Sequence, residues 1–257
     1  MNMPTALVTN ASDFAGPPAV QALVASGFHV LVCDRTFHDP AIWARFSEAH
    51  PGAELVKAAD NATLVEAIWS AAGRVDVVVS NDHYPALHRP IEEATLDDLR
   101  KTLEILVVEP YALLKAATPR LKAQGGGNII MITSCRTRLP MPGGAIPDAA
   151  RAAANALVRS LAIELAPFEI AVNAVAPNFL YSEAYYPRAV FVENPSGRAF
   201  VEASVPAKRL GRPDEIGELI RFLATSKARF LTGAIIDFSG GWPASPLRPP
   251  TPDSVRS

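Results

Sequence analysis

The stretch TNASDFAG, residues 9–16, decides the fold of this chain. It follows the apolar run Thr5–Thr9, which predicts a strand, and it leads into a segment of helical period. Many α/β proteins hold the phosphates of a dinucleotide at such a turn, and glycine is needed there because a side chain would fill the space of a phosphate. Asn10 and Phe14 stand where glycine is expected, and only Gly16 remains. A dinucleotide is therefore disfavoured, although Phe14 could instead pack beneath a loop that still tolerates a nucleotide.

The alternation of strand and helix continues along the chain. Short runs rich in Val and Ile predict strands that are buried on both faces, as in a parallel sheet covered by helices with right-handed crossovers. We therefore predict an α/β fold of three layers around a doubly wound parallel sheet, which is Rossmann-like. The predicted strands are Thr5–Thr9, His29–Cys33, Val75–Ser80, Asn128–Thr133, Ala171–Ala176 and Ala234–Phe238. The predicted helices are Pro18–Ser26, Asp39–Ala49, Ala62–Ala72 with an Asn61 cap, Thr95–Gln124, Ala149–Leu165 and Pro213–Ala224.

Composition narrows the possible functions. The 257 residues carry a net charge of −2 with mixed signs, which predicts neither a nucleic-acid surface nor a membrane anchor and favours a small-molecule or protein partner. The apolar runs are too short to span a membrane. Cys33 and Cys135 are the only cysteines, too few for a disulfide framework or a zinc site, so we expect a reducing, cytoplasmic location. We expect one domain over 1–242 and a proline-rich tail over 243–257.

Three motifs together resemble those of the halohydrin dehalogenases, within the short-chain dehydrogenase/reductase superfamily. They are the stretch 9–16, Val79–Asp82 and Ala176–Leu180, and the likeness runs along almost the whole chain. Its specific part is the pairing of Phe14 with Pro177-Asn178, where dehydrogenases usually carry Pro-Gly. The resemblance implies that no nucleotide cofactor or metal is used and that a halide or similar small anion binds. The residues expected to bind halide or substrate are Phe14, Pro177, Asn178, Phe179, Leu180 and Tyr186.

The resemblance also implies a catalytic Ser, Tyr and Arg at a fixed spacing. The Ser orients the substrate hydroxyl, the Tyr removes its proton, and the Arg assists the Tyr. Ser134 follows a predicted strand, and Arg151 lies where the Arg is expected. The Tyr position is occupied by Pro147, and no tyrosine lies between Ser134 and Arg151. Because proline has no ionisable group, the reaction implied by the resemblance, conversion between vicinal halohydrins and epoxides plus halide, lacks its base.

Two groups could change or replace the lost chemistry. Asp148 could act as the base, although it equally suits the first turn of a helix. Tyr185 and Tyr186 could face the substrate, although packing in the core or in a lid explains each of them. The chain could also be a catalytically inactive homologue that binds a ligand or serves as an oligomer component.

Three further expectations remain. Arg136 and Arg138 would suit a carboxylate or phosphate on the substrate, although a solvated loop explains them as well. Asp34, after the second strand, could hold a ribose if the chain is instead an NAD(P)-dependent oxidoreductase. Fold analogy implies a homo-oligomer, a tetramer or dimer, that packs through the helices Thr95–Gln124 and Ala149–Leu165.

Overall fold

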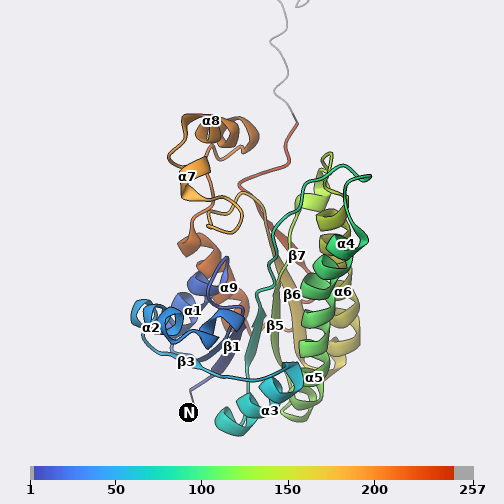
Figure 1. Cartoon of the computed structure of the whole chain (residues 1–257). Helices are drawn as coiled ribbons and strands as arrows, with labels where there is room; N and C mark the ends of the chain where they lie inside the picture. The colour runs from blue at the N-terminus through green and yellow to red at the C-terminus, as the bar shows by residue number, and fades with distance from the viewer. Residues whose placement is uncertain (1–2, 246–257) are drawn as a thin grey trace, which may run out of the picture.

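A single parallel sheet forms the centre of the computed structural model, which describes residues 3–245 (Figure 1). The seven strands lie in the order β3-β2-β1-β4-β5-β6-β7, so the chain reverses direction across the sheet between β1 and β4. In sheets of this kind ligands bind outside the carboxyl ends of the strands near that reversal. The strands are β1 Thr5–Thr9, β2 His29–Cys33, β3 Ala53–Leu55, β4 Val77–Ser80, β5 Gly127–Ile132, β6 Ile170–Pro177 and β7 Ile235–Phe238.

Helices cover both faces of the sheet and complete the three predicted layers (Figure 1). Along β1, Ala6 and Val8 pack towards α1, α2 and α9, while Leu7 between them packs towards α3, α5 and α6. The α/β, Rossmann-like prediction is therefore confirmed. The helices are α1 Gly16–Ala25, α2 Pro40–Ala49, α3 Asn61–Ala72, α4 Leu96–Leu103, α5 Glu109–Ala123, α6 Ala145–Leu165, α7 Arg188–Phe191, α8 Pro195–Ser204 and α9 Pro213–Thr225.

Several predicted boundaries were wrong. The expected helix Thr95–Gln124 is interrupted by a wider π-helical turn at Glu104–Val108, which separates α4 from α5. Asn61 does not cap α3, because the side chain of Asp60 accepts the hydrogen bond from the Thr63 amide. The helix α6 begins at Ala145 and so includes Pro147 in its first turn, where the missing proline N–H breaks no helical hydrogen bond. The strand β3 and the helices α7 and α8 were not predicted.

The turn after β1 keeps a glycine-like backbone without its glycines. Asn10 has φ 47° and Phe14 has φ 57°, both in the left-handed region that glycine adopts most readily. The turn is fastened by Asn81, whose Nδ2 donates to the carbonyl oxygens of Asn10 at 2.8 Å and Asp13 at 3.0 Å. Gly16 is required, because a Cβ there would lie 2.6 Å from the carbonyl oxygen of Ala11.

The predicted tail falls almost entirely at 246–257, outside the described residues. None of the described helices combines the length and apolar character that crossing a bilayer would require.

Candidate functional site

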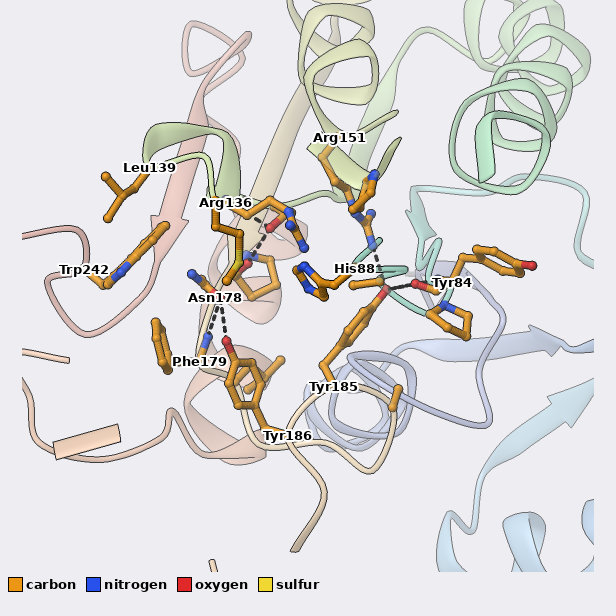
Figure 2. Close-up of a pocket in the computed structure, with 18 of the residues that line it drawn as sticks. Tyr84, His88, Arg136, Leu139, Arg151, Asn178, Phe179, Tyr185, Tyr186 and Trp242 are labelled. Carbon is orange, nitrogen blue, oxygen red and sulfur yellow. Dashed lines mark hydrogen bonds between the residues drawn. The ribbon is translucent and has the colours of Figure 1, made fainter. Parts of the chain in front are cut away.

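The catalytic and halide-binding residues that the resemblance implies line one cavity at the carboxyl ends of β5 and β6 (Figure 2). Its volume is about 710 Å³, and Pro147 and Tyr185 belong to its wall. The predicted residues that line it are Phe14, Ser134, Arg151, Pro177, Asn178, Phe179, Leu180 and Tyr186. Apolar side chains from distant segments complete the wall, among them Leu106, Leu139, Phe191, Phe200 and Trp242.

Ser134 follows the end of β5, and its hydroxyl group bridges two neighbouring strands. The Oγ donates to the carbonyl oxygen of Pro177 at 3.0 Å and accepts from the amide of Arg136 at 3.2 Å. Ser134 is only 8% exposed, yet it borders the cavity. These two bonds fix the hydroxyl group beside the anion-binding residues predicted after β6.

Arg151 projects from α6 into the same site and is almost fully buried, with 4% of its surface exposed. Its Nη1 donates to the carbonyl oxygens of Asp82 at 3.0 Å and Ile132 at 3.4 Å. Its Nη2 donates to the hydroxyl oxygen of Tyr185 at 3.0 Å (Figure 2). A buried cation needs such partners, because burial without them is costly. The phenol partner was not predicted from the sequence.

The predicted anion pocket is built around the side chain of Asn178. Its Oδ1 accepts from the Phe179 amide at 3.0 Å and from the Tyr186 hydroxyl at 2.8 Å (Figure 2). Phe179 has φ 55°, and its ring centroid lies 5.2 Å from that of Tyr186 and 5.9 Å from that of Trp242. With Oδ1 committed, the Nδ2 group of Asn178 donates to none of the residues 3–245 and is available to an anion. Burial raises the pKa of Tyr186 to about 12, so this hydroxyl stays protonated.

Asp148 and the two nearby arginines differ in their placement. Asp148 sits in the first turn of α6, and its carboxylate accepts a hydrogen bond from Nε of Arg136 in a partly buried ion pair. Arg136 lines the cavity, but its charge is matched by Asp148. Arg138 instead pairs with Asp237 at 2.7 Å and does not line this cavity. The expectation of two guanidinium groups facing the substrate is therefore wrong for Arg138.

Two further titratable groups near the site were not singled out from the sequence. His88 lines the cavity, and its pKa is lowered by burial and by the neighbouring Arg136 charge. Asp82 is buried beneath the site, where its Oδ2 accepts from the Ser80 hydroxyl at 2.6 Å. Burial raises the pKa of Asp82 to about 7. Histidine in an irregular loop gives no spacing signal, so His88 could be found only in the structure.

The fold implies a dinucleotide, but the residues of this chain do not fit one. A second cavity of about 500 Å³ lies beside Asn10 and Asp34, and within the described chain it shares no lining residue with the first. Phe14 borders the first cavity, with its ring centroid 4.9 Å from that of Tyr185 and 6.0 Å from that of His83. A dinucleotide needs one continuous cleft with glycines at the phosphates.

Asp34 is also engaged within the protein. Its Oδ2 accepts from the Ser12 amide at 2.9 Å, and its Oδ1 accepts from the amide and hydroxyl of Thr36 at 2.8 Å and 2.7 Å. It therefore caps the short helical turn at Arg35–His38. Across 3–245, no group of His, Cys, Asp or Glu side chains is arranged to hold a metal ion.

Comparisons with known proteins identify relatives with this architecture. Residues 16–243 match the family model described as enoyl-(acyl carrier protein) reductase. A halohydrin dehalogenase (HheC), solved with bound ethyl (2S)-oxiran-2-ylacetate, is 34% identical with a TM-score of 0.91, over 96% of this chain and 100% of that chain. A protein described as a dehalogenation enzyme is 35% identical with a TM-score of 0.90, over 94% and 98% respectively.

Curated relatives are mostly oxidoreductases. Human dehydrogenase/reductase SDR family member 4 is 28% identical over 249 residues, which are 93% of this chain and 87% of the human protein. The match to the family model, the strand order and these relatives all indicate the same family. The chain belongs to the short-chain dehydrogenase/reductase family of enzymes.

Proposed function

We propose that this chain is a halohydrin dehalogenase that interconverts vicinal halohydrins and epoxides plus halide without a nucleotide cofactor. One observation carries the proposal: Ser134 and Arg151 share a cavity with the Asn178 pocket, and Phe14, which stands where a phosphate-binding turn needs glycine, contacts Tyr185 in the wall of that cavity. Further support comes from the two dehalogenases that are 34% and 35% identical, one of them solved with an epoxide ester.

The proposed reaction needs only proton transfer and displacement. The Ser134 hydroxyl turns from the Pro177 carbonyl oxygen to donate to the substrate oxygen, and an acceptor in the protein takes the proton of that oxygen. The oxygen then attacks the neighbouring carbon, a C–O bond forms, and the C–halogen bond breaks as its electron pair leaves with the halide. Asn178 Nδ2 and the aromatic ring of Phe179 stabilise the departing anion. Since both reacting centres belong to one molecule held in the cavity, orientation supplies much of the acceleration.

Halide release tests the proposal directly. Purified protein is incubated with a panel of vicinal chloro- and bromohydrins, and the released halide and the epoxide are both measured. We expect the two products in equal amounts. We expect activity that is lost in Ser134→Ala and unaffected by added NADH or NADPH. Bromide binding without turnover of any halohydrin would instead identify an inactive homologue.

The second candidate is an NAD(P)-dependent oxidoreductase, which the family model and the human relative favour. Titration with NADH and NADPH, followed by nucleotide fluorescence, separates the two. Saturable binding at micromolar concentration would overturn the proposed function, because the cavity arrangement predicts none.

We also propose that the chain forms a homo-oligomer, a dimer or tetramer. Large apolar side chains are exposed on three helices. They include Leu96 on α4, Tyr111 on α5 and Ile163 on α6, with exposures of 67%, 50% and 80%. Burying such side chains against a second copy would favour association.

A further inference from the structure

The proposed function leaves one chemical requirement unmet by the residues that the spacing identifies. The substrate hydroxyl must lose a proton, and Pro147, which lines the cavity one helical turn before Arg151, cannot accept it. The inference that follows rests on the proposed function and concerns which group of this chain takes the proton.

Tyr185 brings a phenol to Arg151 from a different part of the fold. It lies in the loop after β6, and its hydroxyl oxygen accepts from Arg151 Nη2 at 3.0 Å and from the Tyr84 amide at 3.0 Å. The same hydroxyl group donates to the carbonyl oxygen of Tyr84 at 2.8 Å. Two donors, one of them cationic, are therefore aimed at the atom that would carry negative charge.

The loop that carries Tyr185 is held in place. The Tyr185 amide donates to the Ser182 hydroxyl at 3.2 Å, and the Tyr186 amide donates to the Ser182 carbonyl oxygen at 2.9 Å. Phe14 packs against the edge of the Tyr185 ring. The position of the hydroxyl is therefore fixed from the backbone, from the ring and from Arg151.

We propose that the Tyr185 hydroxyl is the proton acceptor that replaces the tyrosine missing at Pro147. In its ionised form the Tyr185 oxygen keeps its bonds from Arg151 and the Tyr84 amide. The Tyr84 carbonyl oxygen lies 2.8 Å away in the direction of the hydroxyl proton, so the substrate O–H takes the place of that carbonyl, which moves aside. The substrate proton passes to the phenolate oxygen as the C–O bond closes and the halide leaves with the C–halogen electron pair. Loss of that proton to water restores the phenolate.

Other titratable groups near the cavity are less suited. The Tyr186 hydroxyl is committed to Asn178, and burial raises its pKa to about 12. The Asp148 carboxylate is paired with Arg136. Asp82 borders the second cavity and not the first. His88 borders the first cavity, but it makes no hydrogen bond to Arg151 or Ser134 among the described residues. The experiment below therefore includes a His88 variant.

The test compares Tyr185→Phe with Tyr111→Phe, a matched loss of one hydroxyl from a half-exposed tyrosine on α5. We expect Tyr185→Phe to lower kcat for halide release by roughly 10²- to 10⁴-fold, the usual contribution of a general base. Bromide affinity, followed through the fluorescence of Trp242 in the cavity wall, should change less than about twofold, as expected if the loss is in proton transfer and not in anion binding. Tyr111→Phe should match the wild type in both measurements.

A rescue variant separates chemistry from loop structure. The double variant Tyr185→Phe/Pro147→Tyr carries a phenol on α6 but lacks the hydrogen bonds between the Tyr185 hydroxyl and the Tyr84 backbone. A kcat for halide release about tenfold or more above that of Tyr185→Phe supports the inference. Wild-type rates in Tyr185→Phe, together with loss of activity in His88→Gln, would overturn the inference and leave the proposed function standing. Failure of the wild type to release halide from any halohydrin would overturn both.

Discussion

The Phe14 ring packs against the edge of the Tyr185 ring, with centroids 4.9 Å apart and ring planes 68° apart. This contact joins the turn after β1 to the loop after β6. Both residues line the first cavity, which has no lining residue in common with the second within the described chain. The same contact thus fills the turn where a nucleotide-binding protein needs glycine and orients the side chain that we propose as proton acceptor.

Removing the Phe14 ring should cost stability in a way that reveals the backbone strain. Truncating a buried Phe usually costs about 3–5 kcal/mol. Phe14→Ala keeps a Cβ at positive φ, whereas Phe14→Gly removes it, so we expect the glycine variant to be the more stable of the two by about 1 kcal/mol. Urea unfolding of both variants and the wild type measures the difference. An alanine variant as stable as the glycine variant would show that the left-handed backbone is not strained.

Asp82 should make the protein less stable as the pH rises from acid to neutral. Burial raises its pKa to about 7 in the folded chain, against an ordinary value of 3.8, so the folded state holds a proton between these limits that the unfolded chain has lost. The free energy of unfolding therefore falls across this window and levels off above it. The total effect is up to about 4 kcal/mol. Asp82→Asn should remove this dependence of the unfolding free energy on pH. Urea unfolding at pH 5 and pH 8 measures the free energy for variant and wild type. An equal change between the two pH values in both proteins would contradict the prediction.

Asn178→Ala should weaken halide binding. The substitution removes the free Nδ2 donor and also the acceptor that holds the Phe179 amide and the Tyr186 hydroxyl. A hydrogen bond to a charged group contributes about 1.5–3 kcal/mol, so the bromide Kd should rise roughly 10- to 100-fold. Tyr186→Phe keeps the Asn178 amide and should raise the Kd less. Equal bromide affinity in wild type and Asn178→Ala would remove Asn178 from the anion site.

Asp148→Asn should convert the cavity into a better receptor for carboxylates. The substitution leaves the Arg136 guanidinium without the charge that now matches it. We expect benzoate to bind roughly fivefold more tightly, equivalent to about 1 kcal/mol. Asp237→Asn is the matched control, because Asp237 neutralises Arg138, which does not line the cavity. If calorimetry gives both variants the same benzoate affinity, the Arg136 charge does not reach the ligand.

Ile163→Asp should dissociate the proposed homo-oligomer. Ile163 on α6 is 80% exposed, so a charge there should leave the fold of the single chain intact while opposing burial against a second copy. Sedimentation velocity should show a mass near that of one chain for the variant and a multiple of it for the wild type. A wild type that sediments as one chain would exclude the oligomer.

The fold was predictable because burial dictates the sequence pattern of its central strands. The runs at Thr5–Thr9 and His29–Cys33 match β1 and β2 residue for residue, since the three central residues of each are apolar and buried. β3 escaped prediction because Ala53–Leu55 is a short edge strand with an exposed Glu54. The π-helical turn at Glu104–Val108 carries no proline or glycine itself, but Pro110 follows it in the first turn of α5, where its missing N–H cannot continue the hydrogen bonds of the preceding turn. The prediction of one helix over Thr95–Gln124 overlooked this signal.

The candidate site was predictable where residues follow strands and not where it depends on loop structure. Ser134 and Asn178 come within two residues of the ends of neighbouring strands, so parallel pairing places them together. The bond between Arg151 and Tyr185 joins residues on α6 and in the loop after β6, and it depends on the turn at Ser182. No residue spacing encodes that turn. The sequence alone therefore shows proline at the position of the expected base and does not reveal the phenol of Tyr185 beside Arg151.

Asn10 and Phe14 carry larger side chains on the backbone conformation that glycine prefers. Few changes therefore separate this turn from a phosphate-binding loop. Two truncations, Asn10→Gly and Phe14→Gly, would expose amides that are already arranged in a loop, with Asn81 still fastening it from below. For protein engineers, the turn after β1 is thus a starting point for building a phosphate-binding loop into this member of the short-chain dehydrogenase/reductase family.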